Sequence, residues 1–342
     1  NIEQVIENIN SIPDTVVLID KHIAKIYQDS FSQIQTQATL ILEATEENKS
    51  YENTKVVLDF FQEHRCTKST TVIAIGGGII QDITAFTTHI YFRGIKWVFV
   101  PTTLLAMCDS CMGAKCGINV NEYKNQVGVF HSPSAILISQ DFLTTLPDDH
   151  IQSGYGEILK HFLSDSWELF NKLEAILDKE GFRNNSLLEL IYLSLKFKQS
   201  VVEADEYEGD FRRILNYGHS FGHALEPLSD FIIPHGTAVA WGIDLINYIA
   251  AENGILKQDD FLRIHKFIKK YFSCSLKQKL SAEDFIRFAK TDKKVRDGKI
   301  NLVFLKEPGK FDILPCEFDD KLKATISDYL DQYNIIQIEC KV

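Results

Sequence analysis

The chain has 342 residues, of which 45% are hydrophobic and 24% charged, and its formal net charge is −11. This length and apolar content indicate a globular protein with a sizeable core and favour two domains over one. The acidic balance argues against a nucleic-acid partner, and no apolar stretch approaches the roughly 20 residues of a membrane helix.

The first part of the sequence alternates strand-like and helix-like segments. Residues 79–92 carry apolar side chains at helical spacing. Buried strands are predicted for the short apolar runs at 15–20, 38–44, 71–78, 97–103 and 134–139. This alternation predicts an α/β, Rossmann-like N-terminal domain with a mostly parallel sheet, which we place at residues 1–150.

From about residue 150 the pattern changes to a 3.6-residue periodicity, and residues 151–342 are predicted to form a mostly α-helical C-terminal domain. A hairpin is expected where residues 298–305 and 310–315 flank a short EPG turn. The boundary falls near the segment LPDDH (146–150). The cleft between two such domains is the default position for a binding site.

The segment GGGIIQD (76–82) follows a predicted strand and opens a predicted helix. Glycines at such a turn let backbone N–H groups approach a phosphate, and the helix N-terminus adds its positive dipole end. The motif favours a dinucleotide, although it is not GxGxxG and a tight turn without a ligand has the same appearance. Asp20 ends the first clear strand and is either a ribose acceptor or a helix cap.

Three histidines stand out in LNYGHSFGHALE (215–226) and IPHGTAVA (233–240). His219 and His223 are four residues apart, so they share one helix face, an arrangement that metal sites and ordinary amphipathic helices both use. The pattern is not HExxH, which disfavours a protease of that class. A third histidine, His235, follows, and a carboxylate could come from Glu157, whose segment we expect to open a helix. Two histidines and one glutamate are typical of a catalytic zinc site.

Polar residues also gather between apolar strands at residues 101–130. This set comprises Asp109, Lys115, Asn119, Lys124 and Asn125. Lysines and an asparagine near a glycine-rich loop suit a phosphate. Further along, Arg212 and Asn216 are four apart, so a helix there would give them one face leading to His219. The residues alone indicate a nicotinamide-type cofactor, a divalent metal and a phosphorylated substrate.

Beyond single motifs, the chain resembles the sugar phosphate cyclases, and among them the 3-dehydroquinate synthases, from about residue 20 to about residue 315. The resemblance rests on GGGIIQD, YFRGI, VPTTLLAMCDSCMGAK, KNQVGVFHSP, GYGEILK, DEYEGDFRRILNYGHSFGHALE, PHGTAVAWG and TDKKVRDGKI, in the family's order and spacing. It implies an NAD- and metal-dependent carbon–oxygen lyase. Such an enzyme oxidises a substrate alcohol transiently, eliminates phosphate, reduces the ketone again and closes a carbocycle.

The resemblance also implies roles for individual residues. Glu157, His219 and His235 match the ligands of zinc, or of cobalt in its place. The matches around the polyol and carboxylate are Asp109, Lys115, Lys160, Lys198, Glu208, Arg212, Asn216 and His223. The residues that match the family's phosphate-binding positions are Lys124, Asn125 and one of Lys293 or Lys294. The NAD set is Asp20, Glu46, Lys49, Gly76, Gly77, Gly78, Asp82, Thr102, Thr103, Phe142, Thr145 and Leu146. Arg93 matches an arginine that reaches the neighbouring subunit's site, which implies a homodimer.

Several departures from the family pattern bear on the substrate. CDSCMGAKC stands where VDSS-x-GGKT is common, Thr237 replaces a glutamate next to His235, and His150 stands at a usually acidic position. The alternatives are an amino-dehydroquinate, 2-epi-5-epi-valiolone or 2-deoxy-scyllo-inosose synthase, a metal-dependent alcohol dehydrogenase, or a relative that binds cofactor without turnover. The seven scattered cysteines and the lack of a signal-like N-terminal segment predict a reduced, cytoplasmic protein.

Overall fold

The computed structural model describes residues 1–121, 123–273, 280–290, 295 and 298–333. The chain divides into two compact units, residues 1–147 and residues 148–342. Lys293 and Lys294, which the sequence assigned to the phosphate-binding positions, lie outside the described residues.

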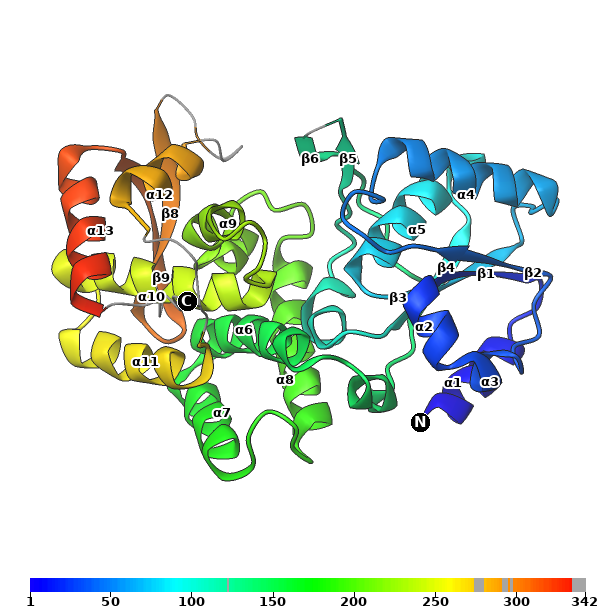
Figure 1. Ribbon diagram of the computed structural model, residues 1–342, viewed down its shortest axis with the longest axis horizontal. Helices are drawn as coiled ribbons and strands as arrows, with labels where there is room; N and C mark the ends of the chain where they lie inside the picture. Colours follow the sequence, from blue (N-terminus) through cyan, green and yellow to red (C-terminus); the bar gives the residue numbers. More distant parts are fainter. Residues whose placement is uncertain (122, 274–279, 291–294, 296–297, 334–342) are drawn as a thin grey trace, which may run out of the picture. The chain divides into compact units, whose positions relative to one another are not determined.

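Unit 1 is built on a five-stranded parallel sheet (Figure 1). In spatial order its strands are β2 (Ala38–Leu42), β1 (Thr15–Asp20), β3 (Thr71–Gly76), β4 (Lys96–Pro101) and β7 (Ala135–Ile136). β3 is buried along its whole length because both faces of the sheet are covered, which explains its unbroken apolar run. The prediction of buried strands was wrong at both edges of the sheet: β2 has no buried residue, and the predicted strand at 134–139 pairs over only two residues, neither of them buried.

Helices cover both faces of this sheet, with α4 and α5 on one face and α1 to α3 on the other (Figure 1). The helices are α1 (Ile2–Asn10), α2 (Lys21–Ile26), α3 (Gln28–Phe31), α4 (Tyr51–Glu63) and α5 (Gly78–Ile90). Shorter elements are the 3₁₀ helices η1 (Tyr91–Arg93) and η3 (Gln140–Thr144), the π-helix η2 (Ala106–Ser110), and a hairpin of β5 (Ile118–Val120) and β6 (Tyr123–Val127). The predicted α/β class is confirmed for this part of the chain.

Unit 2 is mostly helical, as predicted, and carries one antiparallel hairpin. Its helices are α6 (Asp148–Asp165), α7 (Trp167–Glu180), α8 (Leu187–Ala204), α9 (His219–Leu228), α10 (His235–Glu252), α11 (Gln258–Tyr271), α12 (Ala282–Ala289) and α13 (Asp320–Tyr333). The 3₁₀ helix η4 (Phe211–Asn216) precedes α9, and the predicted hairpin is β8 (Lys299–Glu307) with β9 (Lys310–Glu317).

α10 is the central helix of unit 2. Residues 236–250 are all buried, and the helix packs against α6, α9, α11, α13 and β8. A helix that is buried on every side belongs inside a core, and this one carries His235 at its first position. The packing of α10 therefore fixes where His235 lies.

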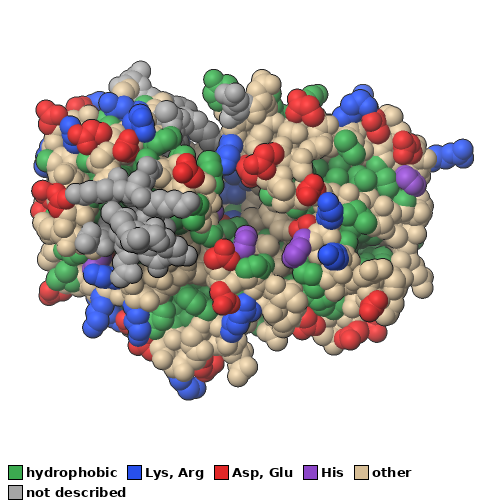
Figure 2. Space-filling view, in the orientation of Figure 1, with side chains coloured by type: hydrophobic (Ala, Val, Ile, Leu, Met, Phe, Trp, Pro, Cys, Tyr) green, Lys and Arg blue, Asp and Glu red, His purple; other side chains and the backbone are tan. Residues whose placement is uncertain are grey.

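Among the described residues, no helix combines the length and the apolar character that crossing a membrane requires. On the face drawn in Figure 2, acidic and basic side chains are interspersed. This face differs from the continuous basic surface that is typical of nucleic-acid binding.

Candidate active site

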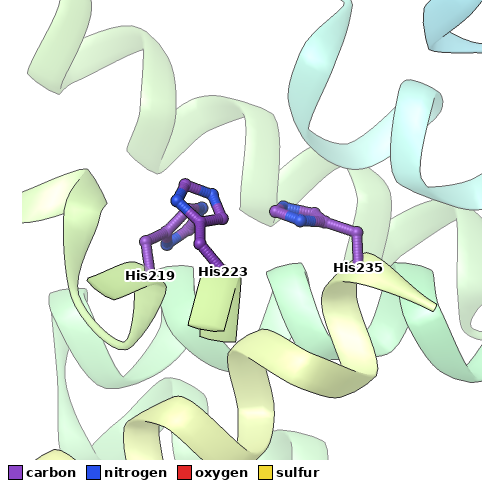
Figure 3. Close-up of side chains that lie close together, drawn as sticks. All are labelled: His219, His223 and His235. Atoms are coloured by element: carbon purple, nitrogen blue, oxygen red, sulfur yellow. The ribbon is translucent and has the colours of Figure 1, made fainter. Parts of the chain in front are cut away.

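Three histidine rings of unit 2 face a common space (Figure 3). His219 and His223 lie one turn apart on α9, and His235 begins α10. The ring centroids are 5.3 Å apart for His219 and His223, 5.4 Å for His219 and His235, and 5.7 Å for His223 and His235. One nitrogen of each ring lies within 4.8 Å of the others. The shared helix face predicted for His219 and His223 is confirmed.

Glycines bring the backbones of α9 and α10 close enough for this arrangement. Gly218 adopts a φ of +76°, and a Cβ on Gly242 would lie 2.0 Å from the Gly218 carbonyl oxygen. A Cβ on Gly222 would lie 3.0 Å from the Cα of Val239. Because interiors are close-packed, larger residues at these positions would force the two helices apart and separate the histidines.

Glu157 reaches the histidines through a similar contact between α6 and α10. A Cβ on Gly156 would lie only 1.9 Å from the carbonyl oxygen of Gly236. The fully buried Glu157 places its Oε1 3.1 Å from His235 Nε2 and 3.6 Å from His219 Nε2. The expectation that Glu157 opens a helix was wrong, because α6 already begins at Asp148, with acidic residues in its first turn.

The other nitrogen of His235 and of His219 has an acceptor of its own. His235 Nδ1 lies 2.7 Å from Glu226 Oε1, and His219 Nδ1 lies 3.2 Å from the carbonyl oxygen of Tyr217. An Nδ1–H that donates to such an acceptor leaves the lone pair on Nε2, which here faces Glu157. Sequence reasoning missed Glu226, although it follows His219 by seven residues and His223 by three and so belongs to their helix face.

The electrostatics of this cluster call for a positive charge between its members. Burial by itself would lower the pKa of His235, but hydrogen bonds to Glu157 and Glu226 raise this pKa to about 10. Burial and the nearby Lys160 ammonium instead hold the pKa of His219 well below its usual range. The Lys160 ammonium lies 2.5 Å from the other oxygen of Glu157. With its raised pKa, His235 holds a proton between its Nε2 and Glu157, and a divalent cation, zinc in particular, could replace that proton on the Nε2 atoms and the carboxylate oxygen.

Buried cations surround this part of unit 2. Lys160 on α6, Lys198 on α8 and Arg212 on η4 are all buried, and these three elements pack against one another. Lys160 is paired with Glu157, and the gathering of three basic side chains in one part of the unit gives that part a positive character that suits an anionic substrate.

The segment that carries Arg212 and Asn216 differs from expectation. Because η4 is a 3₁₀ helix, residues four apart do not share a face, so the predicted common face was wrong. Arg212 Nη1 donates to the carbonyl of Glu206, and Asn216 Nδ2 donates to Glu208 Oε1 at 2.8 Å. Glu208 itself has a φ of +60°.

In unit 1 the carboxyl ends of three parallel strands bring Asp20, Gly76 and Thr102 to one edge of the sheet. A Cβ on Gly76 would lie 2.5 Å from Ile80 Cγ1, and the first turn of α5 has no side-chain cap. The buried hydroxyl of Thr102 has no hydrogen-bond partner among the described residues. An uncapped helix N-terminus beside an unsatisfied hydroxyl fits the pyrophosphate and ribose of a dinucleotide.

Charged residues of the predicted NAD set form a network around Lys49. The nearly buried Lys49 ammonium lies 3.4 Å from Glu46 Oε1 and 3.3 Å from Asp82 Oδ2. It also donates to Asn125 Oδ1 at 2.9 Å. Burial raises the pKa of Asp82 to about 6, although Lys49 acts in the opposite direction. The structure thus brings together residues predicted separately for cofactor and phosphate.

The other predicted cofactor residues have varied surroundings. Asp20 caps α2 by accepting from the His22 N–H at 2.9 Å, and burial raises its pKa. Phe142 is buried in an edge-to-face contact with Tyr27, whose hydroxyl bonds Thr145 at 2.8 Å. Of the remaining members, Gly77, Gly78 and Thr103 lie close to the sheet edge, and Leu146 lies just before the start of α6.

The remaining predicted substrate residues of unit 1 lie on loops and short elements. Asp109 lies in the π-helix η2, a rare element that is frequent at functional sites. Lys115 and Lys124 are exposed, as is Arg93, whose φ of +59° is unusual for a residue with a side chain.

The sheet edge of unit 1 and the histidine–glutamate cluster of unit 2 fit an enzyme that uses NAD and a metal ion, and the family comparisons place the chain in the sugar phosphate cyclase class. Residues 39–153 match the family described as 3-dehydroquinate synthase N-terminal, and residues 154–295 match 3-dehydroquinate synthase C-terminal. A protein of Prochlorococcus marinus named 3-dehydroquinate synthase is 37% identical over 328 residues, covering 93% of this chain and 89% of the relative. The chain belongs to the 3-dehydroquinate synthase family.

Solved structures share the fold. The 2-epi-5-epi-valiolone synthase ValA of Streptomyces hygroscopicus, with NAD⁺ and Zn²⁺ bound, matches with a TM-score of 0.84 and 24% identity, covering 93% of this chain and 92% of that one. A 2-deoxy-scyllo-inosose synthase with carbaglucose-6-phosphate, NAD⁺ and Co²⁺ matches with a TM-score of 0.84 and 22% identity, covering 96% and 94%. At this identity the likeness bears on the fold alone.

Proposed function

We propose that the protein converts 3-deoxy-arabino-heptulosonate 7-phosphate into 3-dehydroquinate and inorganic phosphate, with NAD and a divalent metal ion, zinc or cobalt. The observation that carries the proposal is the contact of Glu157 with both His219 and His235 in a chain of this family. The buried cations of unit 2 support an anionic substrate. The reaction belongs to the shikimate pathway, which supplies the aromatic amino acids.

Glu157, His219 and His235 would hold the metal ion, with Glu226 and the Tyr217 carbonyl fixing the two imidazoles. When bound, the metal polarises a substrate alcohol and lowers its pKa. We prefer this set to the three histidines because His223 is exposed while Glu157 is buried against both other ligands. His223 remains open to the substrate and can hold or move a proton there.

The sheet edge of unit 1 would hold NAD. Its pyrophosphate would lie on the N–H groups of Gly77 and Gly78, and Thr102 and Asp20 supply a hydroxyl and a carboxylate nearby. When bound, NAD accepts a hydride from the substrate and returns it. The remaining members of the proposed NAD set are Glu46, Lys49, Gly76, Asp82, Thr103, Phe142, Thr145 and Leu146.

The substrate is held by its anionic groups and hydroxyls. Arg212 recognises the carboxylate through its planar fork, and Lys124 and Asn125 bind the phosphate, with Lys293 or Lys294. The other proposed contacts are Asp109, Lys115, Lys160, Lys198, Glu208 and Asn216. Holding both ends of the substrate orients its reacting alcohol and leaving group, which is a large part of catalysis.

We further propose a cytoplasmic homodimer in which Arg93 reaches the partner's site. Arg93 is exposed, and its neighbours Ile90 and Phe92 leave 43% and 55% of their surface exposed, which suits an interface. The described cysteines are free thiols, which fits a reducing compartment.

Another cyclase of the class is the second candidate, because the family's glutamate beside His235 is absent. Thr237 takes its place, is buried, and its hydroxyl lies 3.2 Å from Gln152 Oε1. A neutral hydroxyl here changes the charge next to the metal ligands, where substrate hydroxyls would bind.

The test is to incubate the full chain with NAD⁺ and zinc and, separately, with the heptulosonate phosphate and with sedoheptulose 7-phosphate. Released phosphate, product mass and NADH absorbance are measured together. We expect phosphate and a product of the mass of 3-dehydroquinate from the first substrate alone, with no net NADH. Release only from the second substrate would assign another cyclase, and stoichiometric NADH would assign an alcohol dehydrogenase. Cofactor binding without turnover would mean a catalytically inactive relative.

A further inference from the structure

Asn119 joins the hairpin β5–β6 to the loop that precedes α4. Its side-chain NH₂ donates to the carbonyl oxygen of Glu46 at 3.1 Å and to Glu46 Oε1 at 2.9 Å. Its amide oxygen accepts from the backbone N–H of Asn125 at 2.9 Å, and its own N–H donates to the Lys49 carbonyl at 2.9 Å. Asn119 is nearly buried and uses both ends of its side chain to connect two loops that are distant in the sequence.

The ammonium of Lys49 sets the orientation of the Asn125 side chain. Lys49 Nζ lies 2.9 Å from Asn125 Oδ1. Because an ammonium group can only donate, the atom facing it must be the amide oxygen. The NH₂ end of the exposed Asn125 side chain is therefore directed away from Lys49 and can donate to an anion. The backbone supports this placement, since Asn125 has a φ of +53°, which asparagine tolerates better than most residues.

The two sides of this connection serve different ligands in the proposed function. Glu46, Lys49 and Asp82 belong to the NAD side, and Asn125 belongs to the phosphate side. We propose that Asn119 is a positioning residue that couples dinucleotide binding to phosphate binding in unit 1. It holds the phosphate-binding hairpin on the cofactor-binding loop, so that a ligand that orders one side reduces the cost of ordering the other. The inference rests on the proposed function because it takes both ligand sets from it.

The coupling is measured by isothermal titration of the zinc-loaded full chain with NAD⁺, in the absence and presence of saturating inorganic phosphate, and by the reciprocal titration. Linkage requires the same factor in both directions. We expect each ligand to tighten the other by about tenfold, within the usual range for coupled sites. Asn119→Ala should reduce this factor to less than about twofold. Gln126→Ala is the matched control, because that side chain is exposed on β6, the other strand of the same hairpin, and takes no part in these hydrogen bonds.

A second variant guards against misfolding. Asn119→Asp keeps the acceptor for the Asn125 N–H but faces Glu46 with a second carboxylate, so it should also lose the coupling. Circular dichroism and thermal unfolding establish that each variant is folded. If either folded variant keeps the wild-type coupling, this inference is overturned but the proposed function is not. The same holds if the wild type binds both ligands without coupling. Failure of NAD⁺ or phosphate to bind the wild type overturns the proposed function and this inference with it.

Discussion

Each unit holds a cluster of acidic groups, but the two clusters have different partners. In unit 1 the Lys49 ammonium lies between Glu46 and Asp82, so the chain supplies its own cation. In unit 2 the Glu157 carboxylate shares one oxygen with Lys160 and turns the other toward imidazole Nε2 atoms. Both clusters thus contain a lysine, but in unit 2 the second oxygen of Glu157 also faces two imidazole Nε2 atoms, and a proton or a metal ion can lie between them. We therefore expect a metal ion in unit 2 and none at Lys49.

The largest effect that this comparison predicts follows from His235→Ala. Removing one of three protein ligands should abolish bound zinc and phosphate release together, by more than the roughly 100-fold that marks loss of an outer-shell partner. Zinc content and phosphate release are measured on the same preparation. His150→Ala, an exposed position at the start of α6, is the control. Full activity in a zinc-free His235→Ala protein would remove the metal assignment.

Arg212→Lys should have the next largest effect, because the proposed function assigns recognition of the substrate carboxylate to this buried guanidinium. The charge is kept but one arm of a bidentate contact is lost, worth about 1.5–3 kcal/mol, so kcat/KM should fall about 10–100-fold. Steady-state phosphate release measures it. Arg213→Lys, on the exposed neighbour, should change little. Equal kinetics for the two variants would exclude Arg212 from the substrate site.

Glu226→Gln tests whether the second carboxylate of unit 2 acts on the metal through His235. The amide oxygen still accepts a hydrogen bond, but the negative charge that strengthens the imidazole as a ligand is gone. We expect zinc affinity to fall about tenfold, measured by competition with a chromogenic chelator. Glu174→Gln, a carboxylate paired with Arg263 on the surface, is the control. Unchanged zinc affinity would make Glu226 a structural residue only.

Asp82→Asn has the smallest predicted effect and concerns unit 1. The folded-state pKa of Asp82 is raised from 3.8 to about 6, so its protonated form is the one that folding favours. Its contribution to stability is fully present below pH about 4 and is lost as the pH rises through about 6.

The asparagine variant should therefore gain stability relative to the wild type between pH 5 and pH 7.5, by about 1.4 kcal/mol. Urea unfolding of the metal- and cofactor-free protein at both pH values measures the gain. Asp59→Asn, at an exposed surface pair, should show no such pH dependence. A gain that is the same at both pH values would mean that Asp82 is charged throughout.

The sequence predicted the fold well because its signals are local. The central buried strands are continuous apolar runs in the sequence, and the three glycines correctly predicted the junction between β3 and α5. The histidine pair was visible because helical spacing alone places both rings together. Glu226 and Asn119 acquire their roles through contacts with His235, Glu46 and Asn125, which depend on how distant segments pack. The η4 segment was misjudged because spacing cannot distinguish a 3₁₀ helix from an α-helix.

The most direct test of the difference between the two clusters is a crystal structure of the zinc-loaded full chain with data collected on both sides of the zinc absorption edge. The account predicts one strong anomalous peak in unit 2, bound by Glu157, His219 and His235. It predicts no such peak at Lys49. A peak bound by His223 in place of Glu157, or no peak at the histidines in protein that contains zinc, would contradict it.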